Sequence, residues 1–207
     1  MRLALSAVVA ASLAVTGCAS SKTAEKTDEK GTAGSEGTTV VAENIKQRKV
    51  GNEKVSEYDL NGDKRADVWT YTVAGKSGDG KDIDKLSRKE LDINYDGKVD
   101  ISRNYDEREQ ISREAMDLDF DGKVDQVNYY EKGTIVRKER DLSSAGKASL
   151  YLFYEKGKLV RKERDNNNDG KIDNWEYWEG EQVDRIGEDL DGDGNVDKWT
   201  KNPNSEG

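Results

Sequence analysis

The sequence predicts an all-β protein, an elongated antiparallel β-hairpin repeat whose hairpins form a single meandering, solenoid-like sheet. Three observations predict this fold. A nine-residue segment with aspartate or asparagine at alternate positions recurs at a nearly constant period. Between the copies lie pairs of runs rich in strand-forming residues, and a short glycine-containing turn separates the two runs of each pair. A closed barrel or a propeller-like arrangement of the same hairpins is the alternative.

The repeated segment is clearest from Asp117 to Asp125, which has aspartate at positions 1, 3, 5 and 9 and glycine at position 6. The copies begin at Asp59, Asp92, Asp117, Asp141, Asp165 and Asp189. The steps from the start of one copy to the start of the next are 33, 25, 24, 24 and 24 residues. The longer first step predicts a longer hairpin tip at about 74–85. The segments therefore predict six loops that join successive hairpins at one edge of the sheet.

Residues 1–17 are predicted to be a lipoprotein signal peptide. Arg2 precedes an apolar run, Leu3 to Val15, which is too short to span a bilayer. The run leads into Val-Thr-Gly-Cys18, which contains the single cysteine of the chain. This tetrapeptide resembles the lipobox of bacterial lipoproteins, although an ordinary signal peptide with a chance cysteine is the alternative. The resemblance implies cleavage before Cys18, a diacylglycerol on its sulfur and an acyl chain such as palmitate on its amine.

The residue after Cys18 is not aspartate, which resembles the outer-membrane sorting signal of enteric-type bacteria. We therefore expect an outer-membrane lipoprotein that is periplasmic or surface-exposed. Residues 18–42 are predicted to be a lipidated, disordered tether, since the stretch 20–39 has no large apolar residue. The β-hairpin repeat domain is predicted at 43–201, and a C-terminal tail at 202–207.

The strands are predicted from the units between the loops. Each unit has an aromatic-rich run, a turn such as Glu-Lys-Gly, and a second run that leads into the next loop. Three units read 126–130 and 135–140, 150–154 and 159–164, and 174–178 and 183–186. Aromatic side chains at alternate positions of the first run share a face of the sheet; the pairs are Trp69/Tyr71, Tyr151/Phe153 and Trp175/Tyr177.

The second run of each unit carries a branched aliphatic residue and, two positions later, an arginine. The pairs are Leu86/Arg88, Ile111/Arg113, Ile135/Arg137, Leu159/Arg161 and Val183/Arg185. Spacing by two predicts that both members share one face. If that face carries the aromatic rows, the guanidinium groups stack over the rings. The rows are then structural packing, with a sugar-binding face as the alternative.

The loop acids predict calcium binding. Carboxylates forced together in a tight turn repel one another unless a cation lies between them, and Ca²⁺ prefers flexible coordination by oxygen alone. Position 6 needs a residue that tolerates positive φ, hence glycine. Position 7 contributes its backbone carbonyl, so its side chain is expected to be free to vary. A single copy also fits an ordinary turn, but a plain turn has no use for the acid at position 9.

Up to five Ca²⁺ sites are expected. The predicted ligands are Asp59, Asn61, Asp63 and Asp67; Asp92, Asn94, Asp96 and Asp100; Asp117, Asp119, Asp121 and Asp125; Asp165, Asn167, Asp169 and Asp173; and Asp189, Asp191, Asp193 and Asp197. The copy at Asp141 has lost three acids and predicts a metal-free turn of the same shape. Apolar residues at positions 2 and 8, such as Leu118 and Val124, are expected to cover a small core beside each ion.

Composition excludes several classes of function. The chain has no histidine and one cysteine, which excludes histidine acid–base chemistry and Cys/His zinc sites. The net charge of −9 disfavours nucleic acid as a partner. Charged residues make up 37% of the chain and hydrophobic residues 33%, which is poor material for a thick two-layer core.

Two resemblances fit these patterns. The nonapeptide with flanking strands resembles the EF-hand-like calcium loops of integrin-type FG-GAP repeats and related bacterial repeats. The hairpin Tyr-Glu-Lys-Gly-Lys-Leu-Val-Arg at 154–161 resembles MORN-type hairpin repeats of bacterial surface proteins. The first resemblance implies calcium loops between β-strands, the second implies β-hairpins, and the loop motif says little about biological role.

The expected function is non-enzymatic. The chain is predicted to be a calcium-binding, lipid-anchored envelope or surface protein that acts as a structural scaffold or protein-interaction module. Its expected partners are the membrane, through Cys18, and an envelope protein or polysaccharide. A polysaccharide-binding surface protein with exposed aromatic rows is the alternative. A hydrolase that uses loop acids is a third reading, which several equivalent loops disfavour.

Overall fold

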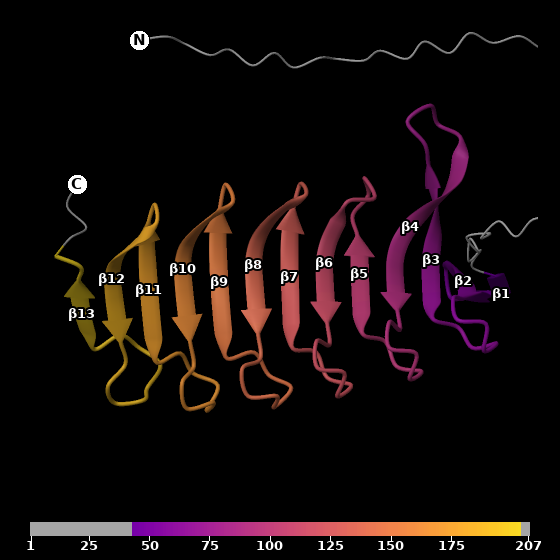
Figure 1. The fold of residues 1–207 in the computed structure, drawn as a ribbon. Coiled ribbons are helices and arrows are strands. Elements are labelled where there is room, and N and C mark those ends of the chain that lie inside the picture. Colours follow the sequence, from indigo (N-terminus) through magenta and orange to yellow (C-terminus); the bar gives the residue numbers. More distant parts are fainter. Residues whose placement is uncertain (1–42, 204–207) are drawn as a thin grey trace, which may run out of the picture. The chain divides into compact units, whose positions relative to one another are not determined.

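The computed structural model describes residues 43–203, which form one antiparallel sheet of 13 strands in chain order (Figure 1). The first strands are β1 (Glu43–Val50), β2 (Glu53–Asp59), β3 (Val68–Lys76), β4 (Asp82–Leu91), β5 (Ile101–Tyr105) and β6 (Ile111–Met116). The rest are β7 (Gln126–Glu131), β8 (Thr134–Arg140), β9 (Leu150–Glu155), β10 (Lys158–Arg164), β11 (Asn174–Glu179), β12 (Gln182–Glu188) and β13 (Lys198–Lys201). The all-β hairpin meander is therefore confirmed.

The sheet is open. Within the described residues, β1 pairs only with β2 and β13 pairs only with β12, so neither a barrel nor a set of propeller blades is formed. The signal peptide, the lipidation site Cys18 and the tether lie outside the described residues, as do residues 204–207. No helix in the part of the chain that the structure describes is both long enough and apolar enough to cross a membrane.

Tight turns set the hairpins. Lys132 and Gly133 connect β7 to β8 with φ of 51° and 77°, and Lys156 and Gly157 connect β9 to β10 with φ of 50° and 79°. Positive φ at both central residues is the type I′ geometry, whose twist matches that of the two strands. Glycine at the second position removes the steric cost there.

The 33-residue step is accommodated by longer strands. β3 and β4 continue to pair from Val73↔Lys85 to Lys76↔Asp82, and only residues 77–81 remain as the turn. Figure 1 shows this hairpin projecting beyond its neighbours. The insertion therefore satisfies its backbone hydrogen bonds by extending the ladder.

A β-bulge at the same place in five hairpins changes which side chains share a face. In β7–β8, Tyr129 pairs with Arg137 and Tyr130 pairs with Ile135, so that Val136 is the extra residue. The equivalent register shifts come immediately before Arg88, Arg113, Arg161 and Arg185. Because Tyr129 and Tyr130 point to opposite faces, Arg137 and Ile135 do so too.

The prediction that the aliphatic residue and the arginine share a face is therefore wrong, because spacing by two spans a bulge. The aliphatic residues instead pair across the strands in Leu86↔Thr72, Ile111↔Tyr105, Ile135↔Tyr130, Leu159↔Tyr154 and Val183↔Trp178. An aromatic and aliphatic row results on the face opposite the arginines.

The aromatic–arginine stacking itself is confirmed. The guanidinium carbon lies 3.8 Å from the ring centre of Tyr71 for Arg88, and 4.2 Å from that of Tyr129 for Arg137. Arg161 lies 4.1 Å from Phe153 in the same way. A glutamate two residues after the arginine adds an ion pair on the same face; the pairs are Arg88–Glu90 at 3.3 Å, Arg137–Glu139 at 2.8 Å and Arg161–Glu163 at 2.9 Å.

Burial in this single layer is concentrated at the loop edge. In the described range the buried hydrophobic residues are Val55, Val68, Tyr71, Ala115 and Leu150. The buried aspartates are Asp59, Asp67, Asp92, Asp100, Asp117 and Asp165. Burying carboxylates is costly unless they are hydrogen-bonded or paired with a cation, so this edge is the candidate functional site.

Candidate metal centre

The six loops lie side by side along one edge of the sheet (Figure 1). Backbone hydrogen bonds continue the ladder into this edge. Asp117 N donates to Asp100 O at 2.8 Å, which joins position 1 of one loop to position 9 of the loop before it. Asp125 N donates to Met116 O at 2.9 Å, which closes the loop across its own base. The same bonds recur in successive loops, so the residues at positions 1 and 9 form a continuous row.

Backbone N–H groups surround the buried carboxylates. In the loop at Asp92, one carboxylate oxygen accepts from Tyr95 N and the other from Gly97 N, both at 2.7 Å. Oδ2 of Asp100 accepts from Ile93 N at 2.7 Å. These donors offset part of the desolvation cost of each carboxylate.

The pKa values of the first residues of three loops follow from this geometry. Burial alone would raise the pKa of Asp59, but N–H donors, with Gly62 and Lys64 first, outweigh burial and hold the pKa below its ordinary value. The balance has the same direction for the pKa of Asp189 and of Asp141. All three aspartates are therefore ionised near neutral pH, which for the predicted ligands Asp59 and Asp189 is the form that binds a metal.

The loops share one backbone shape. Position 6 has positive φ in all six, for example 91° at both Gly97 and Gly122, as predicted. Position 4 also has positive φ, which the sequence analysis missed; φ is 64° at both Tyr95 and Phe120. The loop at Asp141, which has lost three acids, keeps both features, with φ of 54° at Ser144 and 79° at Gly146. Its predicted similarity of shape is therefore confirmed.

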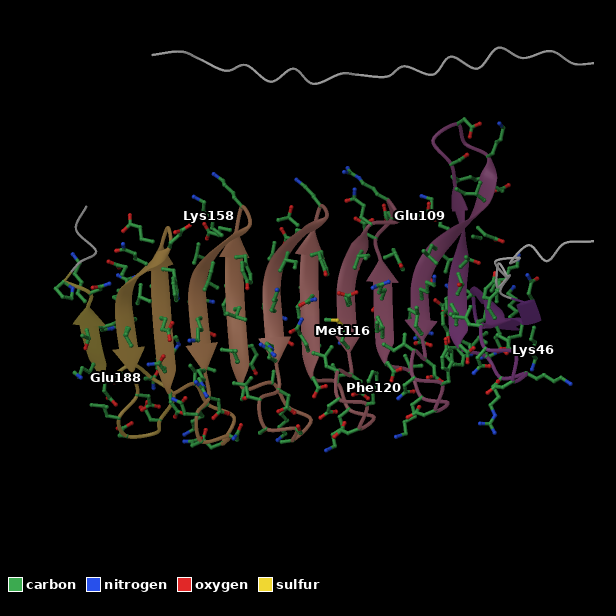
Figure 2. All side chains as sticks on the ribbon, in the orientation of Figure 1. Lys46, Glu109, Met116, Phe120, Lys158 and Glu188 are labelled. Carbon is green, nitrogen blue, oxygen red and sulfur yellow. The ribbon has the colours of Figure 1, made fainter. Side chains whose placement is uncertain are left out.

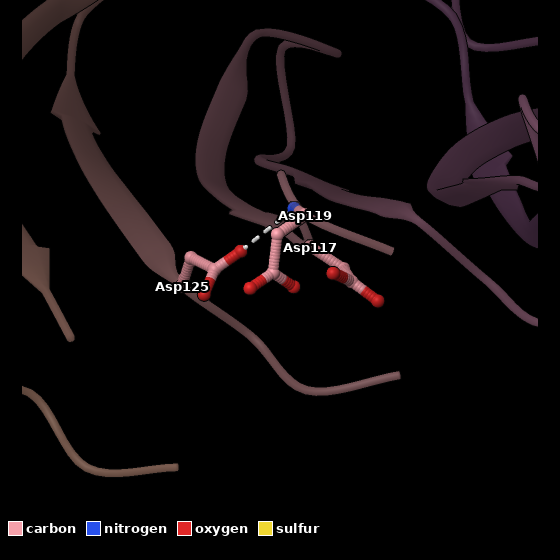
Figure 3. A group of neighbouring side chains, drawn as sticks. All are labelled: Asp117, Asp119 and Asp125. Atoms are coloured by element: carbon pink, nitrogen blue, oxygen red, sulfur yellow. Dashed lines mark hydrogen bonds between the residues drawn. The ribbon is translucent and has the colours of Figure 1, made fainter. Parts of the chain in front are cut away.

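Two loops bring three carboxylates together. The groups are Asp117, Asp119 and Asp125, and Asp189, Asp191 and Asp197; in each, one oxygen per residue lies within 4.8 Å of the others. Figure 3 shows the first group, with the hydrogen bond from the N–H of Asp119 to Asp125. These two groups could hold a metal ion.

The predicted ligands at position 5 of these loops are not in the groups. Asp121 instead accepts the N–H of Lys123 at 2.8 Å, and its other oxygen lies 3.4 Å from Lys123 Nζ. Asp193 likewise accepts the N–H of Asn195 at 2.7 Å. The structure therefore gathers three of the four predicted side chains in each of these loops.

The loops at Asp59, Asp92 and Asp165 have asparagine at position 3, so each has one carboxylate fewer. Asn61 and Asn94 accept the N–H of the residue at position 5, Asp63 and Asp96, at 2.8 and 2.9 Å. Asn167 accepts from Asp169 N in the same way at 2.8 Å, and its Nδ2 reaches Asp169 at 3.2 Å and Asp173 at 3.4 Å.

Two buried carboxylate oxygens in these loops lack a partner among the described residues. They are Oδ1 of Asp100 and Oδ1 of Asp165, and the two residues are 2% and 6% exposed. A buried, ionised oxygen without a donor is costly. A cation bound in the loop would satisfy it, so the donor set fits a hard, oxygen-coordinated metal ion.

The side chain at position 7 has a role that the sequence analysis missed. Lys123 Nζ donates to Ser144 O at 2.9 Å, and Lys171 Nζ donates to Gly192 O at 2.6 Å. Each lysine thus reaches position 4 of the next loop. The signal was present, because four successive loops have lysine at position 7. The expectation that this side chain is free to vary is corrected.

The expected small core beside each ion is not formed by position 2. Leu118 is 52% exposed and Leu190 is 68% exposed, while Ile93 and Leu142 are both 47% exposed. Position 8 is mixed, since Val124 is 47% exposed whereas Ile172 is half-buried. The prediction was wrong because the described sheet has no second layer to cover these side chains.

Comparisons with known proteins give little. No family model matches the chain, and no curated protein matches it. Among solved structures it is similar to one described as the crystal structure of accessory secretory protein 1,2 and 3 in Streptococcus pneumoniae. The identity is 14% and the TM-score 0.32, over 58% of this chain and 18% of that one. A similarity of this size says nothing about the function of this chain.

Proposed function

We propose that this chain is a non-enzymatic, calcium-binding envelope protein whose hairpin sheet serves as a scaffold or protein-interaction module. The observation that carries the proposal is the row of buried aspartates along one edge of the sheet. Six aspartates there are buried, and two of their oxygens have no partner among the described residues. Most of the buried carboxylate oxygens accept loop N–H groups, as they would in an ordinary turn, and the two oxygens without a partner are the ones that a bound cation would satisfy.

Calcium is the metal proposed because the available ligands are all oxygens. In the loop at Asp117 the side chains of Asp117, Asp119 and Asp125 would hold the ion, and a backbone carbonyl would add to them. The loops at Asp59, Asp92 and Asp165 would use an asparagine oxygen at position 3. When bound, the ion supplies positive charge that cancels the repulsion between carboxylates and thereby fixes the angle between hairpins.

The stabilisation follows from mass action. An ion that binds only the folded loop stabilises it by RT ln(1 + [Ca²⁺]/Kd), or about 1.4 kcal/mol per site at tenfold excess over Kd. Extracellular calcium modules bind at about 10⁻⁴–10⁻³ M, so millimolar calcium outside the cytoplasm would fill such sites. Five filled sites would be a large part of the stability of an ordinary domain.

Titration calorimetry and thermal melts with and without EGTA test this proposal. Wild-type protein is expected to bind several ions and to melt at a higher temperature in millimolar calcium. Asp117→Asn with Asp125→Asn removes one ion from the stoichiometry. Asp141→Asn, in the loop that has lost three acids, is the matched control and keeps the stoichiometry. Equal melting temperatures in EGTA and calcium, with no heat of binding, would eliminate the proposal.

The lipid anchor on Cys18 and the outer-membrane location belong to the same proposal and rest on the sequence. Two or three acyl chains would hold the protein stably, since each buried methylene contributes about 0.8 kcal/mol. Mass spectrometry of protein extracted from membranes is expected to show loss of residues 1–17 and addition of diacylglycerol and acyl chains. Cys18→Ser should abolish both changes, and an unmodified intact N-terminus would contradict them.

The polysaccharide-binding alternative needs open aromatic faces. Guanidinium groups already lie over Tyr71, Tyr129, Phe153 and Tyr177, which favours structural packing for that row. Trp199 is 50% exposed, and the guanidinium carbon of Arg185 lies 5.4 Å from its ring centre. Retention on immobilised envelope polysaccharide that is lost in Trp69→Ala or Trp175→Ala, without loss of fold, would favour the alternative.

A further inference from the structure

Exposed apolar side chains are concentrated at the loop edge. Of the eleven large hydrophobic residues that are exposed in the described range, eight lie in the loops. They include Ile93, Tyr95, Leu118, Phe120, Leu142 and Leu190. Figure 2 shows Phe120 at this edge, and Glu109 and Lys158 at the edge formed by the hairpin turns. These side chains form an apolar row that is interrupted at the loop of Asp165, which has asparagine at positions 2 and 4, and such a row is suited to meet another surface.

The same loops carry the charge that calcium would cancel. The six nine-residue segments contain 18 aspartates against six lysines and arginines, a balance of −12. Five Ca²⁺ ions would bring this balance to −2. Without the metal the apolar row lies within a strongly anionic edge, which repels anionic surfaces. With the metal the same row lies in a nearly neutral edge.

The dimensions of the edge decide between occupants. Neighbouring loops are two strands apart, or roughly 9.6 Å, so the six loops span about 50 Å of a layer about 10 Å thick. The contact area is then at most about 500 Å² per molecule, and two copies meeting edge to edge would bury about 1,000 Å² in total. Stable protein interfaces bury about 1,600 Å², so this narrow row suits a deformable lipid headgroup layer better than a second copy.

The open coordination positions of the ion and the length of the tether also favour a lipid headgroup layer. Three side-chain oxygens and one carbonyl leave positions open on an ion that takes 6–8 ligands, and a lipid phosphate oxygen can fill them. Residues 18–42 number 25 and span at most roughly 85 Å when extended, which lets the sheet reach the membrane that holds Cys18. A contact too small to bind alone then acts at a high effective concentration.

We propose that calcium loading converts the loop edge into a docking surface for phosphate-bearing lipid headgroups, with the exposed side chains of loop positions 2 and 4 entering the headgroup layer. This inference rests on the calcium binding proposed above. The sheet would then lie with its loop edge on the membrane in calcium and would be released from it by a chelator.

A fluorescent probe on the full-length, membrane-extracted protein tests the inference. An environment-sensitive dye is attached at Leu142→Cys, in the loop that is expected to bind no metal, while acylation of Cys18 prevents labelling there. Lys158→Cys, at the opposite edge, is the matched control. In vesicles of one part phosphatidylglycerol to three parts phosphatidylethanolamine, calcium should shift the emission of the Leu142 probe to the blue, and EGTA should reverse the shift. The Lys158 probe should not respond.

A second variant separates this inference from the proposed function. Leu118→Glu with Phe120→Glu changes no predicted ligand, so calorimetry should still find the wild-type number of ions while the blue shift is lost. Calcium binding without any shift, or a shift that is equal at both edges, overturns the docking surface and leaves the calcium sites standing. A shift that occurs in calcium without vesicles indicates self-association and also overturns it. Absence of calcium binding removes both proposals.

Discussion

The ammonium group of Lys171 donates a hydrogen bond of 2.6 Å to the carbonyl oxygen of Gly192, and this bond joins two successive loops of the repeat. Lys123 makes the equivalent bond to Ser144. In a single-layer sheet these side chains link neighbouring loops directly, beyond the backbone ladder. The repeat is therefore held together along its loop edge by side chains as well as by strand pairing.

Lys171→Met is expected to lower the stability by about 0.5–1 kcal/mol, because it removes one charge-assisted hydrogen bond at an exposed site and keeps the length of the side chain. Urea denaturation in EGTA measures the change without interference from metal. Lys147→Met is the matched control, because among the described residues Lys147 makes its hydrogen bond within its own loop, from its backbone N–H to Asp141. Equal losses in both variants would mean that the bond between loops contributes nothing.

Lys64→Gly is expected to stabilise the protein by about 0.5–1 kcal/mol. Lys64 has φ of 69° at position 6, where four of the other loops with positive φ have glycine at 89–92°. Glycine removes the steric cost of this backbone conformation. The opposite kind of change at position 4 of the same loop, Gly62→Ala at φ of 83°, is expected to destabilise the protein. Nothing lies within 4 Å of the added Cβ, so the cost comes from the backbone conformation. Thermal melts of both variants check the opposite signs.

Arg161→Met is expected to destabilise the sheet by about 1 kcal/mol or more. It removes a guanidinium 4.1 Å from the ring centre of Phe153 and an ion pair of 2.9 Å with Glu163. A double-mutant cycle with Phe153→Leu isolates the stacking, and a coupling of about 0.5–1 kcal/mol is expected. An additive cycle would show that the arginine acts through Glu163 alone.

We expect Glu114 to cause part of the loss of folding stability in acid. Burial alone would raise its pKa, but hydrogen bonds from Arg103, Asn128 and Tyr130 outweigh burial and hold the pKa below the ordinary value of 4.5. The folded protein thus binds this proton less readily than the unfolded chain does. The contribution of Glu114 is therefore complete above about pH 4.5 and is lost as the pH falls through the lowered pKa.

The acid loss can be assigned with Glu114→Gln. Urea midpoints in EGTA between pH 6 and pH 3 are expected to fall less steeply in this variant than in the wild type. The variant should also be less stable than the wild type at pH 6, because the charge-assisted bond from Arg103 Nε, 2.7 Å long, is gone. Identical pH dependence in the two proteins would show that other acids account for the whole effect.

Much of the fold could be predicted from local pattern. The predicted strand at 126–130 forms Gln126–Glu131, and the one at 159–164 forms Lys158–Arg164. The loop positions and the glycine at position 6 follow from residue type, because positive φ and turn chemistry are local properties. The aromatic and arginine rows also follow from the sequence, since their side chains recur in register with the loops.

Local residue patterns are therefore enough to specify the repeat, its strands, its loops and the acids that could bind a metal. The position of Ile135 and its equivalents on the face opposite the arginines depends on a bulge, which is a property of pairing between two strands and is seen only in the folded sheet. The exposure of Leu118 and the hydrogen bond from Lys171 to the next loop are likewise seen only in the folded sheet. Exposure depends on whether another layer covers the side chain, and a contact depends on how neighbouring units lie. No pattern within one unit specifies either.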